Sequence, residues 1–294
     1  MLMGVGIGGL ISYDAPALFF FRFRGTIMAE VTEVELPTIT GNMLFYKKPE
    51  LLNVQAHGKL GITPLTEQPF AFLRDTQVVP INVSEFNHVA LNYPIIFAGE
   101  EKTPAAVMGL KTDQNAFVDE DGKIAPGVYL PAYIRRYPFA SAKNTDDANS
   151  LMICIDRSSP LVTENADSPF FEGQELAEVT KQAVEFVKIY ETEIQGTVNF
   201  VKMLKDYDLF ETIDVLVAGP PDAQSQPTQQ KMGTYEGISE EKIAGLSDER
   251  LIELRNNGGL AAIYAHRLSQ ANWQRLLNME MSQELKKVNS AGKT

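Results

Sequence analysis

The sequence predicts an α+β fold: an antiparallel sheet packed by a long helix, with a C-terminal helical bundle. Short apolar runs separated by turn residues fill much of the first half of the chain. Such short connections favour antiparallel pairing, because parallel strands need a crossover of a dozen or more residues. Apolar residues then recur every three or four positions over residues 175–205, and serines that suit helix N-caps follow near the C-terminus.

Apolar runs rich in β-branched and aromatic residues mark the expected strands. They cover residues 78–83, 93–98, 104–110, 115–118, 150–156 and 214–217. Ser84 is expected to cap a short helix that runs through Ala90 and ends before Pro94. A second short helix or turn is expected over residues 129–136 behind Pro131, since proline suits a first helical position.

The clearest helix covers residues 175–205. One apolar stripe is expected to face the core, and it comprises Leu176, Val179, Ala183, Phe186, Tyr190, Ile194, Val198, Val201 and Leu204. Glu191 belongs to the opposite, polar face. Gly196 indicates a bend or a close contact, because a glycine within a helix costs about 1 kcal/mol relative to alanine.

Residues 219–233 are rich in Pro, Gln and Ser and are expected to form an exposed loop. Three helices should follow. Ser239 caps the first and Ser247 the second, which ends at a left-handed signal over residues 256–258. The third is expected over residues 260–279.

The N-terminal residues 1–27 differ from the rest of the chain and are expected to be an extension that is disordered or not native. Arg22 and Arg24 follow the apolar part instead of preceding it, which does not fit a secretory signal. Asp14 and Pro16 interrupt the segment, so no transmembrane span is expected, although a membrane-contacting segment remains an alternative. Residues 28–287 should form a single domain and residues 288–294 a disordered tail. We expect a cytoplasmic protein, with surface association left open.

The composition is that of a globular protein with an acidic surface. The formal net charge is −12 and the sequence pI is about 4.8. Such a surface repels phosphate groups, so neither nucleic acid nor an anionic membrane is an expected partner. Cys154 is the only cysteine, which excludes an intrachain disulfide and a zinc site of several cysteines. In an apolar strand its thiol is expected to be inert.

Neither a metal nor a cofactor is expected. The three histidines occur in no zinc-binding helical pattern. An EF-hand loop with Gly122 at its sixth position would place Phe117 and Val128 where oxygen ligands belong, so residues 119–122 predict a hairpin turn instead. The glycines of residues 4–9 follow no strand and therefore do not indicate a dinucleotide site.

The strongest candidates for ligand binding are two adjacent arginines among tyrosines, together with one histidine of the last helix. The set comprises Arg135, Arg136, Tyr129, Tyr133, Tyr137 and His266. The planar guanidinium suits a carboxylate. The alternative is structural: an internal salt bridge to an acid such as Asp119 or Asp156, with tyrosines packed on the arginine stems, and a histidine that bonds across a helix–sheet junction.

Several sequence elements resemble the SapC family, bacterial proteins named after a component of a surface-layer gene cluster. The elements are Tyr46-Lys47-Lys48-Pro49, Tyr93 to Ala98, Tyr129 to Phe139, Cys154-Ile155-Asp156, and the pattern of Leu251, Leu254, Gly258, Leu260, Ile263, Tyr264, Ala265, His266 and Ser269. The resemblance spans most of residues 44–277 and implies a role near surface-layer or outer-surface protein production or export. It implies no catalytic residues. The Phe-rich N-terminal segment departs from the family pattern.

The first functional hypothesis is a non-catalytic accessory or adaptor protein with a protein partner, such as a surface-layer or export component. One alternative is an enzyme that uses the arginine–tyrosine cluster on a peptide or small acid, or a partner of a flavin-dependent halogenase-like enzyme. Another is a structural surface-layer subunit. A single cleft lined by Arg135, Arg136, Tyr133 and His266 would favour an enzyme, whereas burial in separate ion pairs would favour the accessory protein.

Overall fold

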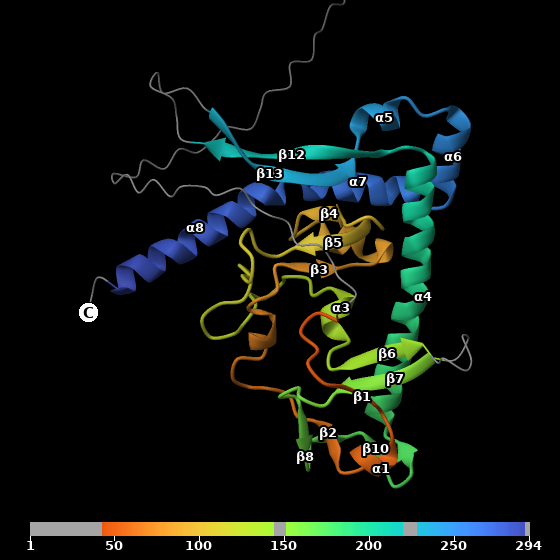
Figure 1. The fold of residues 1–294 in the computed structure, drawn as a ribbon, viewed down its shortest axis with the longest axis vertical. Coiled ribbons are helices and arrows are strands. Elements are labelled where there is room, and N and C mark those ends of the chain that lie inside the picture. The colour runs from red at the N-terminus through yellow and green to blue at the C-terminus, as the bar shows by residue number, and fades with distance from the viewer. Residues whose placement is uncertain (1–42, 144–150, 220–227, 292–294) are drawn as a thin grey trace, which may run out of the picture. The chain divides into compact units, whose positions relative to one another are not determined.

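The computed structural model describes residues 43–143, 151–219 and 228–291. All of them belong to one compact unit, residues 33–294. The extension expected over residues 1–27 lies outside the described residues. The antiparallel sheets, the long helix and the C-terminal helices confirm the predicted α+β class (Figure 1).

The largest sheet has five strands in the order β12-β13-β4-β5-β3, and every pair is antiparallel. These strands are β3 (Val78–Pro80), β4 (Ile95–Ala98), β5 (Thr103–Val107), β12 (Phe210–Gly219) and β13 (Thr228–Ile238). The residues of β4 are all buried, because strands flank it on both sides and helices pack on it. The expected strands at 93–98 and 104–110 are therefore confirmed, and they lie at the centre of the core.

The remaining strands form smaller antiparallel sheets, so the structure divides what we expected to be one sheet. The first has the order β1-β7-β6, with β1 (Pro49–Leu51), β6 (Phe139–Lys143) and β7 (Leu151–Asp156). The second has the order β8-β2-β9, with β2 (Leu60–Ile62), β8 (Val162–Glu164) and β9 (Ser168–Pro169). A two-stranded pair joins β10 (Phe171–Glu172) to β11 (Glu175–Leu176).

The long helix, α4, spans Glu178–Asp206 and packs against both β6 and the 3-10 turn η2 (Val83–Glu85). Figure 1 shows it running from the small sheets to the C-terminal helices. Its first expected residues instead pair in β11. The predicted stripe is buried at Tyr190, Val201 and Leu204, but Val179 and Val198 are 52% and 53% exposed. Two residues of the predicted inner stripe therefore present apolar side chains to solvent.

Gly196 lies on an exposed part of α4, and a Cβ added there would meet no atom within 4 Å. Neither the expected close contact nor a steric need for glycine is found. Replacing Gly196 with alanine should raise the free energy of unfolding by about 0.5–1 kcal/mol, because alanine loses less backbone entropy in a helix. Urea denaturation measures this change. A loss of stability would show that the helix requires glycine here.

Four helices end the described chain: α5 (Glu240–Ala244), α6 (Asp248–Asn256), α7 (Gly259–Ser269) and α8 (Asn272–Ala291). The hydroxyls of Ser239 and Ser247 accept hydrogen bonds from the first turns of α5 and α6, as expected. Gly258 has a φ of 81°, which confirms the left-handed signal.

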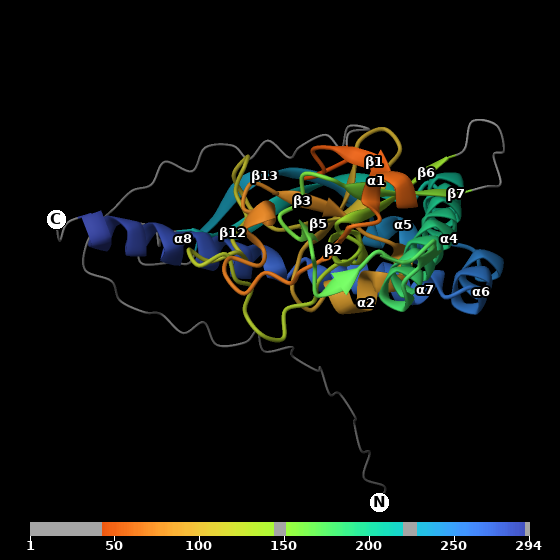
Figure 2. The ribbon, with the colours of Figure 1, turned by 90° about the horizontal axis from the view of Figure 1, so that it is seen from below.

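The single helix expected over residues 260–279 is two helices. The chain breaks between them because Gln270 and Asn272 bond to backbone carbonyls of Ile95 and Ala90. The second helix, α8, continues past Lys287 to Ala291, where we expected a disordered tail. Figures 1 and 2 show its C-terminal half extending beyond the strands.

Three further expectations were wrong. Part of the predicted loop over residues 219–233 is strand β13, because residues 228–233 pair with residues 215–219 of β12 despite their polar composition. Residues 115–118 form no strand; only an isolated bridge joins Val118 to Ile124 around the predicted turn. Asn82, not Ser84, caps the short helical segment, because its side chain and that of Glu85 form a capping box.

The short helices are α1 (Val54–His57), η1 (Ala71–Leu73), α2 (Phe86–Val89) and α3 (Ala132–Arg135). The helix expected behind Pro131 is α3, although Pro131 is its N-cap and not its first residue. This placement positions the two arginines: Arg135 ends α3 and Arg136 is its C-cap.

Candidate functional site

Three of the five sequence elements that carry the resemblance, around Lys47, Tyr137 and Asp156 itself, meet at the carboxylate of Asp156. Its two oxygens accept hydrogen bonds from the backbone N–H groups of Lys47 and Lys48, at 3.1 and 2.9 Å, and from the backbone and side chain of Ser158. The hydroxyl of Tyr137 donates to it over 3.3 Å. Burial acts to raise the pKa of Asp156, but these hydrogen bonds together hold the pKa below its usual value. The side chain of Asp156 thus joins the segments around Lys47, Tyr137 and Ser158 by hydrogen bonds.

Arg136 lies inside a cage of tyrosines. Its guanidinium carbon is 4.3 Å from the ring centre of Tyr133, 4.6 Å from that of Tyr190 and 5.7 Å from that of Tyr46. The residue is only 6% exposed. Burial raises the pKa of Tyr46 and of Tyr190 well above the ordinary value. Neutral rings therefore surround the cation with their electron-rich faces.

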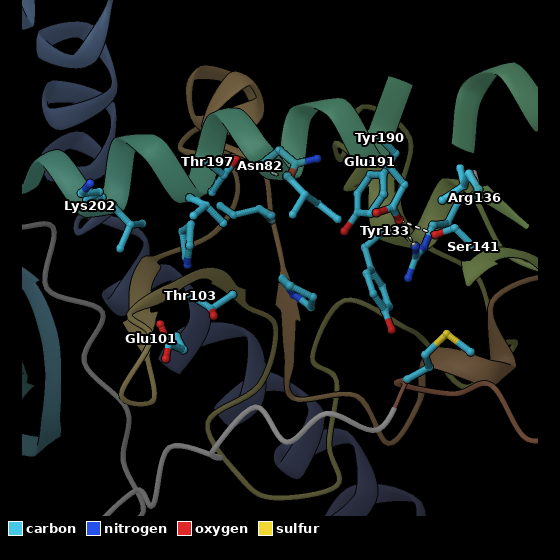
Figure 3. Close-up of a pocket in the computed structure, with 18 of the residues that line it drawn as sticks. Asn82, Glu101, Thr103, Tyr133, Arg136, Ser141, Tyr190, Glu191, Thr197 and Lys202 are labelled. Atoms are coloured by element: carbon cyan, nitrogen blue, oxygen red, sulfur yellow. Dashed lines mark hydrogen bonds and ion pairs between the residues drawn. The ribbon is translucent and has the colours of Figure 1, made fainter. Parts of the chain in front are cut away.

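The cage leaves one hydrogen-bond donor of Arg136 without a partner. Its Nη1 is 3.8 Å from Oε1 of Glu191, which is longer than a hydrogen bond, and its Nε is buried without a hydrogen-bond partner. The same Glu191 oxygen accepts a hydrogen bond from the hydroxyl of Ser141 (Figure 3). The structural alternative from the sequence was an ion pair of the two arginines with an acid such as Asp119 or Asp156. The structure places Glu191 beside Arg136 instead.

Arg135 is held by a different set of groups. Its guanidinium donates to the carbonyl of Leu130 and the hydroxyl of Tyr129, at 3.0 and 3.2 Å, and lies 3.9 Å from Glu85. It also stacks over Phe186 of α4, 5.0 Å from the ring centre. Its side chain is 43% exposed, so this ion pair contributes little to stability.

The tyrosine hydroxyls of the predicted set all have internal partners. Tyr129 donates to the buried Glu85, and burial, aided by this carboxylate, raises the pKa of Tyr129 to about 12. Burial raises the pKa of Tyr137 to about 12 as well. The hydroxyl of Tyr133 accepts a hydrogen bond from the backbone of Leu44 over 2.9 Å. At neutral pH the hydroxyls of Tyr129 and Tyr137 therefore carry no charge for proton abstraction.

His266 lies apart from the arginines. It is 1% exposed, on α7, with its ring 5.4 Å from that of Phe97 and 6.4 Å from that of Tyr235. Its Nε2 is 3.3 Å from the amide of Gln270, and its Nδ1 has no hydrogen-bond partner. Burial, with a smaller contribution from Arg267, lowers the pKa of His266 to about 3. The neighbouring Ser269 accepts a hydrogen bond from the backbone of Ile95, which joins α7 to β4.

A groove of about 750 Å³ runs along α4 and ends at Arg136; we call it the α4 groove (Figure 3). Ile81, Pro104, Ile194, Val198 and Val201 are among its apolar lining residues. Tyr133, Arg136, Ser141, Tyr190 and Glu191 line one end, and Glu101, Lys202 and Lys205 line the other. Of the predicted site residues, Arg136 and Tyr133 line the groove, whereas Arg135 and His266 do not.

The chemistry of the other candidate groups is limited within the part of the chain that the structure describes. No group of three or more His, Cys, Asp or Glu residues there could hold a metal ion. No described helix is both long and apolar enough to cross a bilayer. Cys154 is buried in β7, and burial raises the pKa of its thiol, which lowers its reactivity.

Sequence reasoning missed Glu85, Ser141, Glu191 and Tyr46 as partners of the arginines. The helical spacing in α4 correctly placed Tyr190 on the inner stripe, but it assigned the next residue, Glu191, to the outer face. Its side chain is 29% exposed and faces β6. The signal available in the sequence was the position of Glu191 directly after Tyr190, whose ring faces inward.

A family model matches residues 52–276, and its description is SapC. The comparisons with curated proteins and with solved structures gave no match. The family match extends from β2 through the five-stranded sheet to the first part of α8, so it includes Arg136, Tyr133 and Tyr190 of the cage and most of the α4 groove, whereas Tyr46 lies before it. The chain belongs to the SapC family.

Proposed function

We propose that this protein is a non-catalytic accessory protein that holds a segment of a partner polypeptide in the α4 groove. The resemblance to SapC proteins suggests the setting, which is the production or export of surface-layer or other surface proteins. The observation that carries the proposal is the groove itself, an apolar channel that remains open beside a buried arginine.

The separation of the candidate residues supports an accessory role over catalysis. Arg135 binds Glu85 and the backbone, while His266 is enclosed in the core beneath β4 and β13. A general base must reach the proton that it abstracts. His266 does not line the groove and stays neutral above about pH 3, so it does not supply acid–base chemistry to a ligand there.

The dimensions of the groove suit a peptide. Its lining includes α4 residues from Tyr190 to Lys205, a stretch of about 22 Å at 1.5 Å per residue. An extended peptide of about six or seven residues covers this length. Val198, at mid-groove and 53% exposed, offers apolar surface that binding would bury.

Replacing Val198 with glutamate should abolish capture of the partner, because a charge would then lie on the apolar wall of the groove. The matched control is Ile189→Glu: Ile189 is 52% exposed on the same helix but does not line the groove. Each full-length variant is cross-linked in native lysate, purified, and its captured proteins are identified by mass spectrometry.

We expect the wild type and Ile189→Glu to recover one surface or export protein in stoichiometric amount. Val198→Glu should not recover it. Recovery of that partner by all three proteins would show that it contacts a surface other than the α4 groove. Recovery by none would contradict an accessory role through a stable protein partner.

A further inference from the structure

We infer that the α4 groove binds the C-terminal end of its partner, an apolar peptide whose free α-carboxylate pairs with Arg136. This inference rests on the proposed function and names the chemistry of the bound segment. It follows from three features of the groove: an arginine at one end whose Nε has no hydrogen-bond partner, an apolar wall, and charged side chains that sum to a net positive charge.

Arg136 is a buried cation whose anionic neighbour, Glu191, lies beyond hydrogen-bond distance. Its Nε has no hydrogen-bond partner, and the carboxylate of Glu191 is 3.8 Å away and already accepts from Ser141. A buried charge is costly unless it is paired and hydrogen-bonded. A carboxylate of a ligand would accept from the guanidinium at short distance, with the fork geometry that arginine provides. The cage of Tyr133, Tyr190 and Tyr46 holds that guanidinium in place.

The charges that line the groove are complementary to an anion. Three cationic side chains, Arg136, Lys202 and Lys205, face two acidic ones, Glu101 and Glu191. Lys205 pairs with Glu101 at 3.8 Å, and Arg136 with Glu191 at the same distance. Lys202 forms no ion pair with any described residue. The groove therefore carries a net positive charge in a chain whose formal net charge is −12.

The wall between the two ends suits a peptide better than an acyl chain. Ile81, Pro104, Ile194 and Val198 provide apolar contacts, and Thr103 adds a hydroxyl to the lining. The hydroxyl of Thr197 also lies there but is already bonded to the backbone of Val83 and Glu193. Hydroxyls can pair with peptide N–H and C=O groups, which an acyl chain lacks.

The end at Arg136 suits the end of a ligand chain. Ser141 of β6 lies there beside the arginine (Figure 3), and Ala142 of β6 and Leu151 of β7 also line the groove. A carboxylate paired with Arg136 therefore lies at this end, with the apolar part of the segment along α4.

The test compares two chemically matched peptide pools on the full-length protein. Both pools are N-acetylated heptapeptides with mixed Ala, Val, Leu, Ile and Phe in the last four positions; one ends in a free carboxylate and the other in a carboxamide. Retained peptides are identified by affinity selection and mass spectrometry, and the best-retained sequence is resynthesised in both forms for affinity measurement. We expect the acid form to bind at least about tenfold more tightly, the scale of a charge-assisted hydrogen bond.

Two variants locate the effect. Arg136→Met keeps an apolar side chain of similar length in the tyrosine cage and should make the acid and amide forms bind equally. Val198→Glu should weaken both forms, and the acid form more strongly, because it adds a negative charge to the groove. The Val198 variant and the wild-type comparison keep the inference testable even if Arg136→Met does not fold.

The possible failures are distinguishable. Equal binding of both forms to the wild type would overturn the carboxylate inference but leave peptide binding, and hence the proposed function, in place. Retention of neither pool together with binding of sodium decanoate would show that the groove takes an acyl carboxylate instead of a peptide. Binding of none of the three probes would overturn the inference, and the lysate experiment would then decide the proposed function separately.

Discussion

Replacing Asp156 with asparagine should lower the free energy of unfolding by about 3 kcal/mol, within the range observed when a buried hydrogen-bond network is broken. The side chain is fully buried, and both of its oxygens accept backbone N–H groups, from Lys47 on one side and from Lys48 and Ser158 on the other. The NH₂ group of an asparagine would face the backbone N–H groups on one of the two sides, where two donors cannot form a hydrogen bond. The segment before β1 would then lose its attachment to β7.

Urea denaturation at neutral pH measures this change. The matched control is Asp214→Asn, because the carboxylate of Asp214 is 49% exposed in an ion pair with Lys231 and should contribute less than about 0.5 kcal/mol. Equal effects of the two substitutions would show that Asp156 does not organise the fold.

Acidification from about pH 7 to about pH 5 should destabilise the protein by about 2 kcal/mol through His266 alone. Burial lowers the folded-state pKa of His266 to about 3, whereas an unfolded chain binds the proton near pH 6.5. The unfolded state therefore binds more protons between these values. The stabilising effect is full above about pH 6.5 and is lost progressively as the pH falls toward 3.

The variant His266→Phe should remove this dependence of the free energy of unfolding on pH, because phenylalanine does not titrate. Its ring should occupy the place of the imidazole beside the rings of Phe97 and Tyr235. The midpoints of urea denaturation at about pH 7, 6 and 5 give the change of stability with pH for each protein. The control His88→Asn changes an exposed histidine on α2 and keeps His266, so it should retain the slope. An unchanged pH dependence in His266→Phe would refute the assignment.

Local sequence signals predicted most of the elements but not how they associate. The two N-cap serines, Gly258 and the inner face of α4 at Tyr190 follow from rules that act over a few residues. The break between α7 and α8 does not, because Gln270 bonds to Ile95, 175 residues earlier in the chain. Strand β13 was mistaken for a loop because its pairing with β12 outweighs its polar composition.

The candidate site was predicted only in part for the same reason. The string Tyr129 to Phe139 correctly indicated that aromatic rings surround an arginine, yet adjacent arginines on a short helix point in different directions. Arg135 reaches Glu85 and Arg136 reaches Glu191, two acids 106 residues apart in the sequence. Which of the chain's many acids would pair with which arginine depends on packing between distant segments, which sequence spacing does not reveal.

The most direct test of the α4 groove is site-specific photo-cross-linking. A photoreactive phenylalanine analogue is placed at position 198, inside the groove, and separately at position 189, outside it, in the otherwise unchanged full-length protein. We predict that position 198 forms a covalent adduct with the C-terminal segment of a single partner protein in native lysate, and that position 189 does not. Adducts at both positions, or at position 189 alone, would contradict the claim that the groove is where this protein holds its partner.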